Sequence, residues 1–204
     1  MMRRAPSHVV SDIRDALLDA AEQLLARYGY KKTTMDDVAR LTGVGKGTIY
    51  LHFPSKEELI LGTIDRLVDR LLDKLRATAG SSADYAERIR EMIVCRVLFR
   101  FDSVRDYSDS LDELLRSLRP EYLARRQGYF AAEAEVFAVV LREGHDAGTF
   151  DCQEPAAAAQ AIVLATNALL PYSLSSQELG RRKDVKEKAE QIADLLLSGL
   201  LRRT

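Results

Sequence analysis

Apolar residues recur at three- and four-residue spacing along most of the chain, which is the repeat of one face of an α-helix. The alternating pattern of a half-buried β-strand is nearly absent. Each apolar segment ends at a glycine, a proline or a polar cluster, as residues 12–28 do at Gly29. The sequence therefore predicts an all-α fold without a sheet, with nine helices over residues 12–28, 34–42, 46–53, 55–79, 84–104, 109–118, 120–146, 155–170 and 183–202.

Local signals support several of these helix starts. Thr34 precedes an apolar segment and has Asp37 three residues later, and Ser55 has the same relation to Glu58. A hydroxyl followed by a carboxylate at this spacing is typical of a capping box. Pro155 suits the first turn of a helix, because that turn needs no backbone N–H from it.

Charge and helix length divide the chain into two parts. Residues 1–56 carry nine Lys or Arg and six Asp or Glu, a net charge of +3, whereas the remainder carries −4. The first three predicted helices are compact, and the later ones are longer and richer in large apolar side chains. We therefore expect a small N-terminal domain, residues 1–53, and a helical body, residues 54–204. The cationic first part favours a polyanionic partner.

Composition removes several classes of protein. The 204 residues are 47% hydrophobic and include two cysteines, Cys95 and Cys152, without metal or disulfide spacing. We expect no metal and no cofactor. The basic start of the chain lacks the apolar core of a signal peptide. The longest apolar stretch contains Gln160 and Asn167 and is too short to span a bilayer. These features predict a cytoplasmic protein without a membrane partner.

Residues 43–53 raise a choice between a phosphate-binding loop and a DNA-binding helix. A P-loop requires Gly, four residues and Gly-Lys-Ser/Thr after a strand, but Gly47 follows Lys46 and no strand precedes. A dinucleotide fingerprint would need glycine where Thr48 stands. A helix-turn-helix accounts for more residues, since Ala39 is small where two helices would touch and Gly43 permits a turn at positive φ.

The same interpretation assigns the remaining positions of the two helices. Apolar residues are expected to face the first helix, namely Val38, Leu41, Val44, Ile49 and Phe53. Polar and aromatic side chains are left on the outer face for a DNA duplex, namely Lys46, Thr48, Tyr50 and His52. Gly47 lets the backbone approach DNA closely, and Thr34 and Lys56, at helix starts, are placed to contact phosphates.

The segment TTMDDVARLTGVGKGTIYLHFPSKEELI, residues 33–60, resembles the DNA-binding signature of the TetR family of transcriptional regulators. The resemblance is dense over residues 11–62. By position it implies DNA contacts from Thr34, Lys46, Gly47, Thr48, Tyr50, His52 and Lys56. It also implies a homodimer formed by the last two helices and a ligand pocket in the body. Gly45 stands where family members often carry a polar residue, so we expect no side-chain contact with a base there.

The body contains a charged cluster that allows two interpretations. Residues 90–101 are apolar almost all round, yet they include Arg96 and Arg100, for which Glu133 and Glu135 are candidate partners. One interpretation is a core salt bridge between two helices. The other is a ligand cavity, whose mixture of aromatic, thioether and polar side chains is typical of small-molecule sites. Its candidate lining residues are Met92, Cys95, Arg96, Phe99, Tyr122, Tyr129, Phe130, Glu133 and Asn167.

Together these features predict a ligand-responsive transcriptional regulator, acting as a repressor. It is expected to bind a near-palindromic double-stranded DNA operator as a homodimer and to be released by a small-molecule effector. Two alternatives belong to other classes: a helical enzyme with Glu133 as its base, or an interaction module with a vestigial helix-turn-helix. No Ser-His-Asp, Cys-His or metal spacing supports an enzyme, and the intact outer face of residues 46–52 argues against a vestigial motif.

Overall fold

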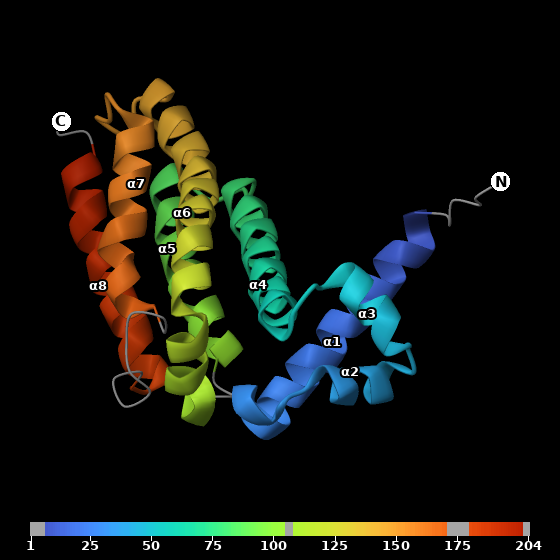
Figure 1. Cartoon of the computed structure of the whole chain (residues 1–204). Coiled ribbons are helices and arrows are strands. Elements are labelled where there is room, and N and C mark those ends of the chain that lie inside the picture. Colours follow the sequence, from blue (N-terminus) through green and yellow to red (C-terminus); the bar gives the residue numbers. More distant parts are fainter. Residues whose placement is uncertain (1–6, 105–107, 171–179, 202–204) are drawn as a thin grey trace.

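The computed structural model describes residues 7–104, 108–170 and 180–201, and in these residues it is helical (Figure 1). Within this described part there is one isolated β-bridge, between Phe150 and Leu201, and no strand. The α-helices are α1 (Ser7–Lys32), α2 (Met35–Thr42), α3 (Lys46–His52), α4 (Lys56–Ala79), α5 (Tyr85–Val104), α6 (Ser108–Asp146), α7 (Pro155–Thr166) and α8 (Arg182–Leu200), and a 3₁₀ helix, Asn167–Leu169, follows α7. The all-α prediction is confirmed.

The described α-helices number eight, not nine, because one predicted boundary does not exist. The expected helices 109–118 and 120–146 form the single helix α6, with Pro120 inside it. Proline removes one backbone hydrogen bond, which kinks a helix without always ending it. Leu118 and Tyr122, on either side of Pro120, are both buried, so packing holds the two halves together. Within α1, the helix end expected at Gly29 is present as a kink, because Gly29 has a non-helical conformation with φ 73° and ψ 176°, and a short second segment then reaches Lys32.

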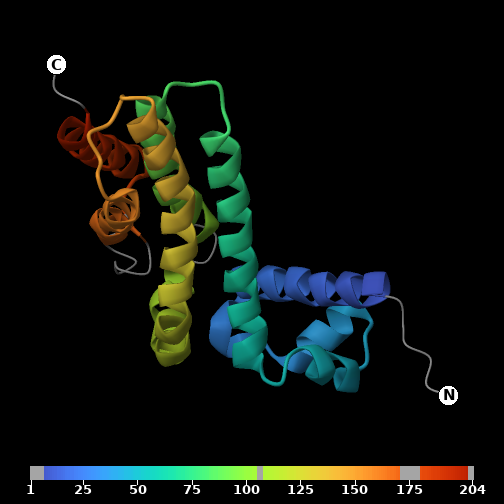
Figure 2. The same cartoon turned by 90° about the horizontal axis from the view of Figure 1, so that it is seen from above.

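Helices α1, α2 and α3 pack together at one end of the molecule, with α1 crossing α4 at a steep angle (Figure 2). The predicted caps are present: Thr34 Oγ1 accepts a hydrogen bond from Asp37 N, and Ser55 Oγ accepts one from Glu58 N, each at 3.2 Å. Gly43 ends α2 at φ 69°, in the left-handed region that glycine adopts without strain.

The core of this end extends beyond the three helices. Its buried residues come from α1, α2 and α3, but Leu59 and Ile60 of α4 and Leu118 of α6 belong to the same cluster. Gly62 of α4 lies so close to the N-terminal helices that a Cβ there would stand 2.8 Å from Phe53 Cε1. Helix α4 is thus packed firmly against the first three helices. The division into residues 1–53 and 54–204 stays a prediction.

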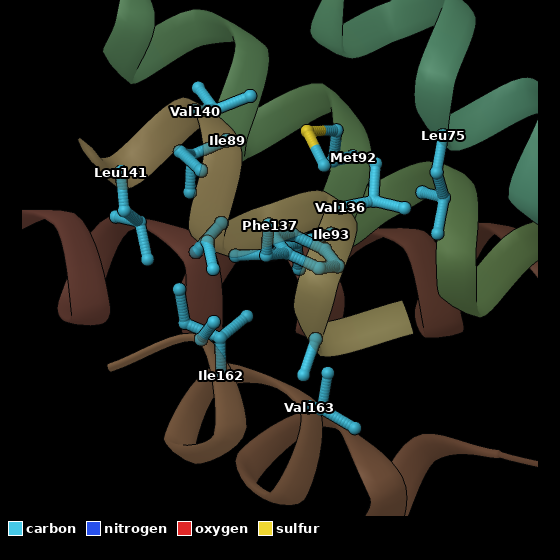
Figure 3. Close-up of a cluster of buried hydrophobic side chains, with 14 of the residues drawn as sticks. Leu75, Ile89, Met92, Ile93, Val136, Phe137, Val140, Leu141, Ile162 and Val163 are labelled. Carbon is cyan, nitrogen blue, oxygen red and sulfur yellow. The ribbon is translucent and has the colours of Figure 1, made fainter. Parts of the chain in front are cut away.

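Helices α5 to α8 lie side by side, and α4 connects them to the N-terminal end (Figures 1 and 2). Figure 3 shows the core between α5, α6 and α7, where Met92, Phe137 and Ile162 meet. Helices α7 and α8 form the side of the body farthest from α1–α3 (Figures 1 and 2). In the described part of the chain, no helix is both long and apolar enough to cross a membrane.

Candidate nucleic-acid interface and buried ion-pair cluster

Helix α3 is held by two inward side chains and presents the rest of its surface. Ile49 and Phe53 are buried against the N-terminal core. Lys46, Gly47 and Tyr50 are exposed, while the predicted DNA contacts Thr48 and His52 are half-buried. Leu51, for which the sequence pattern predicts no role, is the most exposed large apolar side chain of this helix, at 85%. Six of the seven residues of α3, all except Ile49, are therefore at least partly accessible to a partner.

One residue of the expected inner face is only partly covered. The pattern predicts that Leu41 faces α1, and Leu41 borders a surface depression that is lined mainly by α1 residues, including Leu24 and Tyr28. Its side chain is nevertheless 51% exposed, so it does not belong to the core. Val38, Ile49 and Phe53 are buried and Val44 is half-buried.

The predicted phosphate-binding residues already have acidic or aromatic neighbours. Lys46 Nζ lies 2.8 Å from Asp36 Oδ1 of α2, and this hydrogen bond raises the pKa of Lys46. Lys56 Nζ stands 4.0 Å from the centre of the Tyr30 ring. The Tyr30 hydroxyl in turn donates to Glu57 Oε1 at 2.9 Å, so α1 is tied to the first turn of α4.

Thr34 lies exposed at the start of α2, but its hydroxyl is engaged. It donates to Asp37 Oδ2 at 2.6 Å and accepts from Asp37 N at 3.2 Å. The hydrogen bond from Thr34 lowers the pKa of the Asp37 carboxyl. Phosphate contact by the Thr34 hydroxyl would have to replace Asp37 as its acceptor.

A second polar cluster joins α4 to α6. Arg125 of α6 donates from Nη2 to Glu58 Oε2 and from Nη1 to Asp65 Oδ2, both at 2.7 Å. The Tyr129 hydroxyl donates to the other oxygen of Asp65. Burial, followed by the hydrogen bond to Asp65, raises the pKa of Tyr129. We call Arg125, Tyr129, Glu58 and Asp65 the α4–α6 clasp; no sequence pattern indicates it, because its partners are sixty or more residues apart.

In the interior of the body, Arg96 and Arg100 of α5 both bind Glu133 of α6. Arg96 Nε donates to Glu133 Oε2 at 2.5 Å, and Arg100 Nη2 donates to Glu133 Oε1. The three side chains are 0%, 2% and 0% exposed. The core salt bridge that the sequence allows is therefore present, with Glu133 as the shared carboxylate. Glu135, the other candidate, is exposed.

Arg96 has one further partner, Thr166 of α7, which the sequence does not indicate. Arg96 Nη1 donates to Thr166 Oγ1 at 2.7 Å, and the Thr166 hydroxyl donates to Ile162 O at 2.8 Å. Desolvation lowers the pKa of Arg96 and is only partly offset by Glu133. The cluster thus connects three helices in the middle of the body. We call Arg96, Arg100 and Glu133 the ionic triad.

The other candidate pocket residues fall into separate surroundings. Met92 is fully buried in the core of Figure 3, and Tyr122 packs beside Tyr129, with ring centres 6.4 Å apart. Cys95 is half-buried in a surface depression shared with α8, and burial raises the pKa of its thiol. Phe99 lies half-buried on α5, and Asn167 caps the end of α7. The nine-residue lining of a single pocket stays a prediction.

Among the described residues, no group of three or more His, Cys, Asp and Glu side chains is arranged to hold a metal ion. The two-helix arrangement α2–turn–α3, with an accessible second helix, defines instead a helix-turn-helix protein. Residues 17–63 match the family described as bacterial regulatory proteins, tetR family.

Similarity to curated proteins extends well beyond this segment. The chain is 30% identical over 156 residues to the HTH-type transcriptional regulator YfiR of Bacillus subtilis, covering 69% of each protein. It is 29% identical over 140 residues to the HTH-type transcriptional repressor KstR2 of Rhodococcus jostii, covering 67% of each. A match to the HTH-type regulator YhgD of B. subtilis, 36% identical over 89 residues, spans 44% of this chain and about half, 47%, of that protein. The chain belongs to the tetR family of transcriptional regulators.

The whole fold also has a close counterpart among solved structures. A transcriptional regulator from Cytophaga hutchinsonii superposes with a TM-score of 0.77, covering 92% of this chain and 98% of that one, at 21% identity. This likeness concerns the fold, in which an N-terminal helix-turn-helix precedes a helical body.

Proposed function

We propose that this regulator is a homodimeric, ligand-responsive repressor that binds a near-palindromic DNA operator through α3 and leaves it when a small molecule binds the body. The observation that carries the proposal is the accessible surface of α3, with Lys46, Tyr50 and Leu51 exposed on a helix anchored by Ile49. A short helix of this kind inserts into the major groove, where cations meet phosphates and exposed side chains meet base edges. The relative KstR2 is described as a repressor, which supports that direction of control.

The proposed DNA contacts remain the seven residues of the sequence prediction: Thr34, Lys46, Gly47, Thr48, Tyr50, His52 and Lys56. Their accessibility supports the assignment, since none of them is fully buried. The acidic partner of Lys46 adds a condition, because this lysine must leave Asp36 before it neutralises a phosphate. Binding to DNA is thus expected to exchange a protein ion pair for a phosphate contact.

Dimerisation is proposed through α7 and α8, at the side of the body farthest from the helix-turn-helix. Leu164 of α7 and Leu195 of α8 are 66% and 73% exposed, more than any other large apolar side chain described in α4 to α8. Gly199 has open space around it, so another helix can approach α8 there. Two helices from each of two chains form a four-helix interface around a two-fold axis. Two recognition helices then read two half-sites about 34–36 Å apart, or a multiple of that distance.

The body is connected to α3 through α4. At its start, α4 is tied to α1 by Tyr30 and Glu57, and further along by Arg66, which binds Asp19 and Glu22. On its other side α4 is held by the α4–α6 clasp. We propose that an effector acts by displacing α6, and with it α4, which changes the separation of the two recognition helices. Effector and operator must then weaken each other equally.

No structural observation favours the enzyme alternative. Both oxygens of Glu133 accept hydrogen bonds from guanidinium groups, so this carboxylate has no oxygen without a donor for a role as a base. The interaction-module alternative would leave the α3 surface without a purpose, and a direct measurement of DNA binding tests it.

The decisive experiment measures binding of the full chain to DNA fragments from its own genomic neighbourhood, by fluorescence anisotropy at several salt concentrations, with footprinting of the bound site. We expect a near-palindromic footprint and a linear fall of log K with log salt. The control variant is Arg76→Ala, an exposed cation at the far end of α4, which should leave binding unchanged. Absence of sequence-specific binding, or only monomers in sedimentation at micromolar concentration with DNA, would refute the proposal.

A further inference from the structure

The ionic triad leaves the interior of the body with an unbalanced charge. Arg96, Arg100 and Glu133 are the buried charged residues among the side chains that the structure describes. Two guanidinium groups therefore share one carboxylate, and the net charge of the triad is +1. Burial of a net charge is unfavourable unless an opposite charge compensates it. Within the described side chains, no second buried carboxylate does so.

Arg96 also carries a polar group without a partner. Its Nε and Nη1 are satisfied by Glu133 and Thr166, but Nη2 is buried and has no hydrogen-bond partner among the residues that the structure describes. The whole side chain is 0% exposed. Buried donors in folded proteins are almost always paired, so an orphan on a buried cation needs an explanation. An anionic acceptor at Nη2 would satisfy the donor and compensate the charge together.

One half-buried aromatic ring lies next to both the buried Arg96 and a second, half-buried arginine. The half-buried Phe130 ring lies 5.3 Å from the guanidinium carbon of buried Arg96 and 5.3 Å from that of half-buried Arg126. Because Arg126 is more accessible than Arg96, an anion that displaced the Phe130 ring would meet Arg126 before it met Arg96.

We propose that Arg96 Nη2 and Phe130 bind a small organic acid, a monocarboxylate with an apolar body, and that acids of this class are the effectors. The carboxylate accepts from Nη2, and the apolar body replaces contacts of the Phe130 ring. A monoanion matches the excess charge of +1, whereas a phosphate monoester carries nearly two charges at neutral pH and would overcompensate it. The proposal rests on the proposed function, in which a small molecule controls DNA binding.

The test compares acids with their neutral isosteres on the full-length dimer. The probes are benzoate, phenylacetate, hexanoate and decanoate, each paired with its primary amide, and binding is measured by calorimetry. At least one acid should bind at least tenfold more tightly than its amide, which corresponds to about 1.4 kcal/mol. Binding by none of the four acids, or equal binding of acid and amide in every pair, would overturn the proposal.

Variants then locate the binding. Arg96→Met should abolish the preference for the acid, and Arg126→Gln, which leaves the triad intact, should weaken acid binding several-fold. The matched control is Arg90→Gln, an arginine of α5 that binds Asp194 at the surface and should change nothing. An unchanged preference in Arg96→Met would overturn the assignment; if that variant does not fold, an unchanged affinity in Arg126→Gln overturns it instead.

Release of the operator is measured separately, so that a failure of the carboxylate site can be distinguished from a failure of the proposed ligand-responsive repressor. If an acid binds at Arg96 without changing the affinity for the operator, the binding site is supported and the acid is not the effector. If an amide releases the operator while the acids do not bind, the ligand-responsive repressor is supported and the carboxylate site is refuted.

Discussion

The ionic triad predicts a strong asymmetry between two substitutions in the same cluster. Glu133→Gln removes the shared carboxylate and leaves two buried arginines facing each other. Breaking a buried pair in this way costs about 3–5 kcal/mol of the free energy of unfolding. Arg96→Met removes one of the two cations and leaves Arg100 and Glu133 as a neutral pair.

The cost of Arg96→Met can be estimated from its hydrogen bonds. The variant lacks the charge-assisted hydrogen bonds to Glu133 and Thr166, which contribute about 1.5–3 kcal/mol each. It also removes the buried Nη2 donor without a partner, whose desolvation costs about 1–3 kcal/mol. This gain offsets part of the loss, and Thr166 keeps its hydrogen bond to Ile162 O. We therefore expect Arg96→Met to be less destabilising than Glu133→Gln.

Urea unfolding followed by circular dichroism measures both variants, at one fixed protein concentration because dimer stability depends on it. For a chain of this size, the destabilisation of Glu133→Gln corresponds to a fall in Tm of roughly 6–20 °C. Equal destabilisation by Arg96→Met and Glu133→Gln would show that Glu133 needs both arginines, so that the positive charge of the triad is not in excess. In that case the charge argument for the triad, and with it the case for an anionic ligand, fails.

Lys46→Ala should lower the magnitude of the log–log salt slope of DNA binding by about 0.9 for each phosphate that the variant no longer neutralises. Asp36→Asn removes the acidic partner of Lys46 and should tighten DNA binding. Anisotropy curves that are unchanged for both variants would place the DNA interface elsewhere. Leu164→Arg combined with Leu195→Arg should give monomers in analytical ultracentrifugation, and persistence of the dimer would exclude the α7–α8 surface. Burial and the hydrogen bond to Asp65 raise the pKa of Tyr129 in the folded protein. The neutral Tyr129 hydroxyl therefore contributes fully to stability below the ordinary tyrosine pKa of about 10, and this contribution is lost as the pH rises above that value. Tyr129→Phe should therefore unfold less steeply with pH than the wild type between about pH 9.5 and 11, and identical profiles would contradict the hydrogen bond to α4.

The helix-turn-helix can be predicted from sequence because its signals are local. The cap at Thr34, the left-handed turn at Gly43 and the second cap at Ser55 each depend on residues within four positions. Leu41 faces α1 as the spacing predicts, but the spacing does not show that a surface depression between α1 and α2 leaves its side chain 51% exposed.

The body is less predictable because its arrangement depends on contacts between distant helices. Pro120 indicates a helix end, but the burial of Leu118 and Tyr122 on either side overrides that local preference. The charges near residues 96 and 133 are visible in the sequence, yet the choice between Glu133 and Glu135 requires the rotation of α6 against α5. No periodicity shows that rotation.

Helix α6 connects the ionic triad and the α4–α6 clasp through one row of side chains. Arg125, Tyr129 and Glu133 follow each other at four-residue spacing, so they lie near one face of the helix. A step of four residues exceeds one helical turn by about 40°. The direction of the side chains therefore changes by about 80° around the helix axis from Arg125 to Glu133. Its first two members bind α4, and its last binds α5. A rotation or shift of α6 caused by a ligand at the triad would therefore also strain the hydrogen bonds to Asp65, because Arg125, Tyr129 and Glu133 all belong to α6.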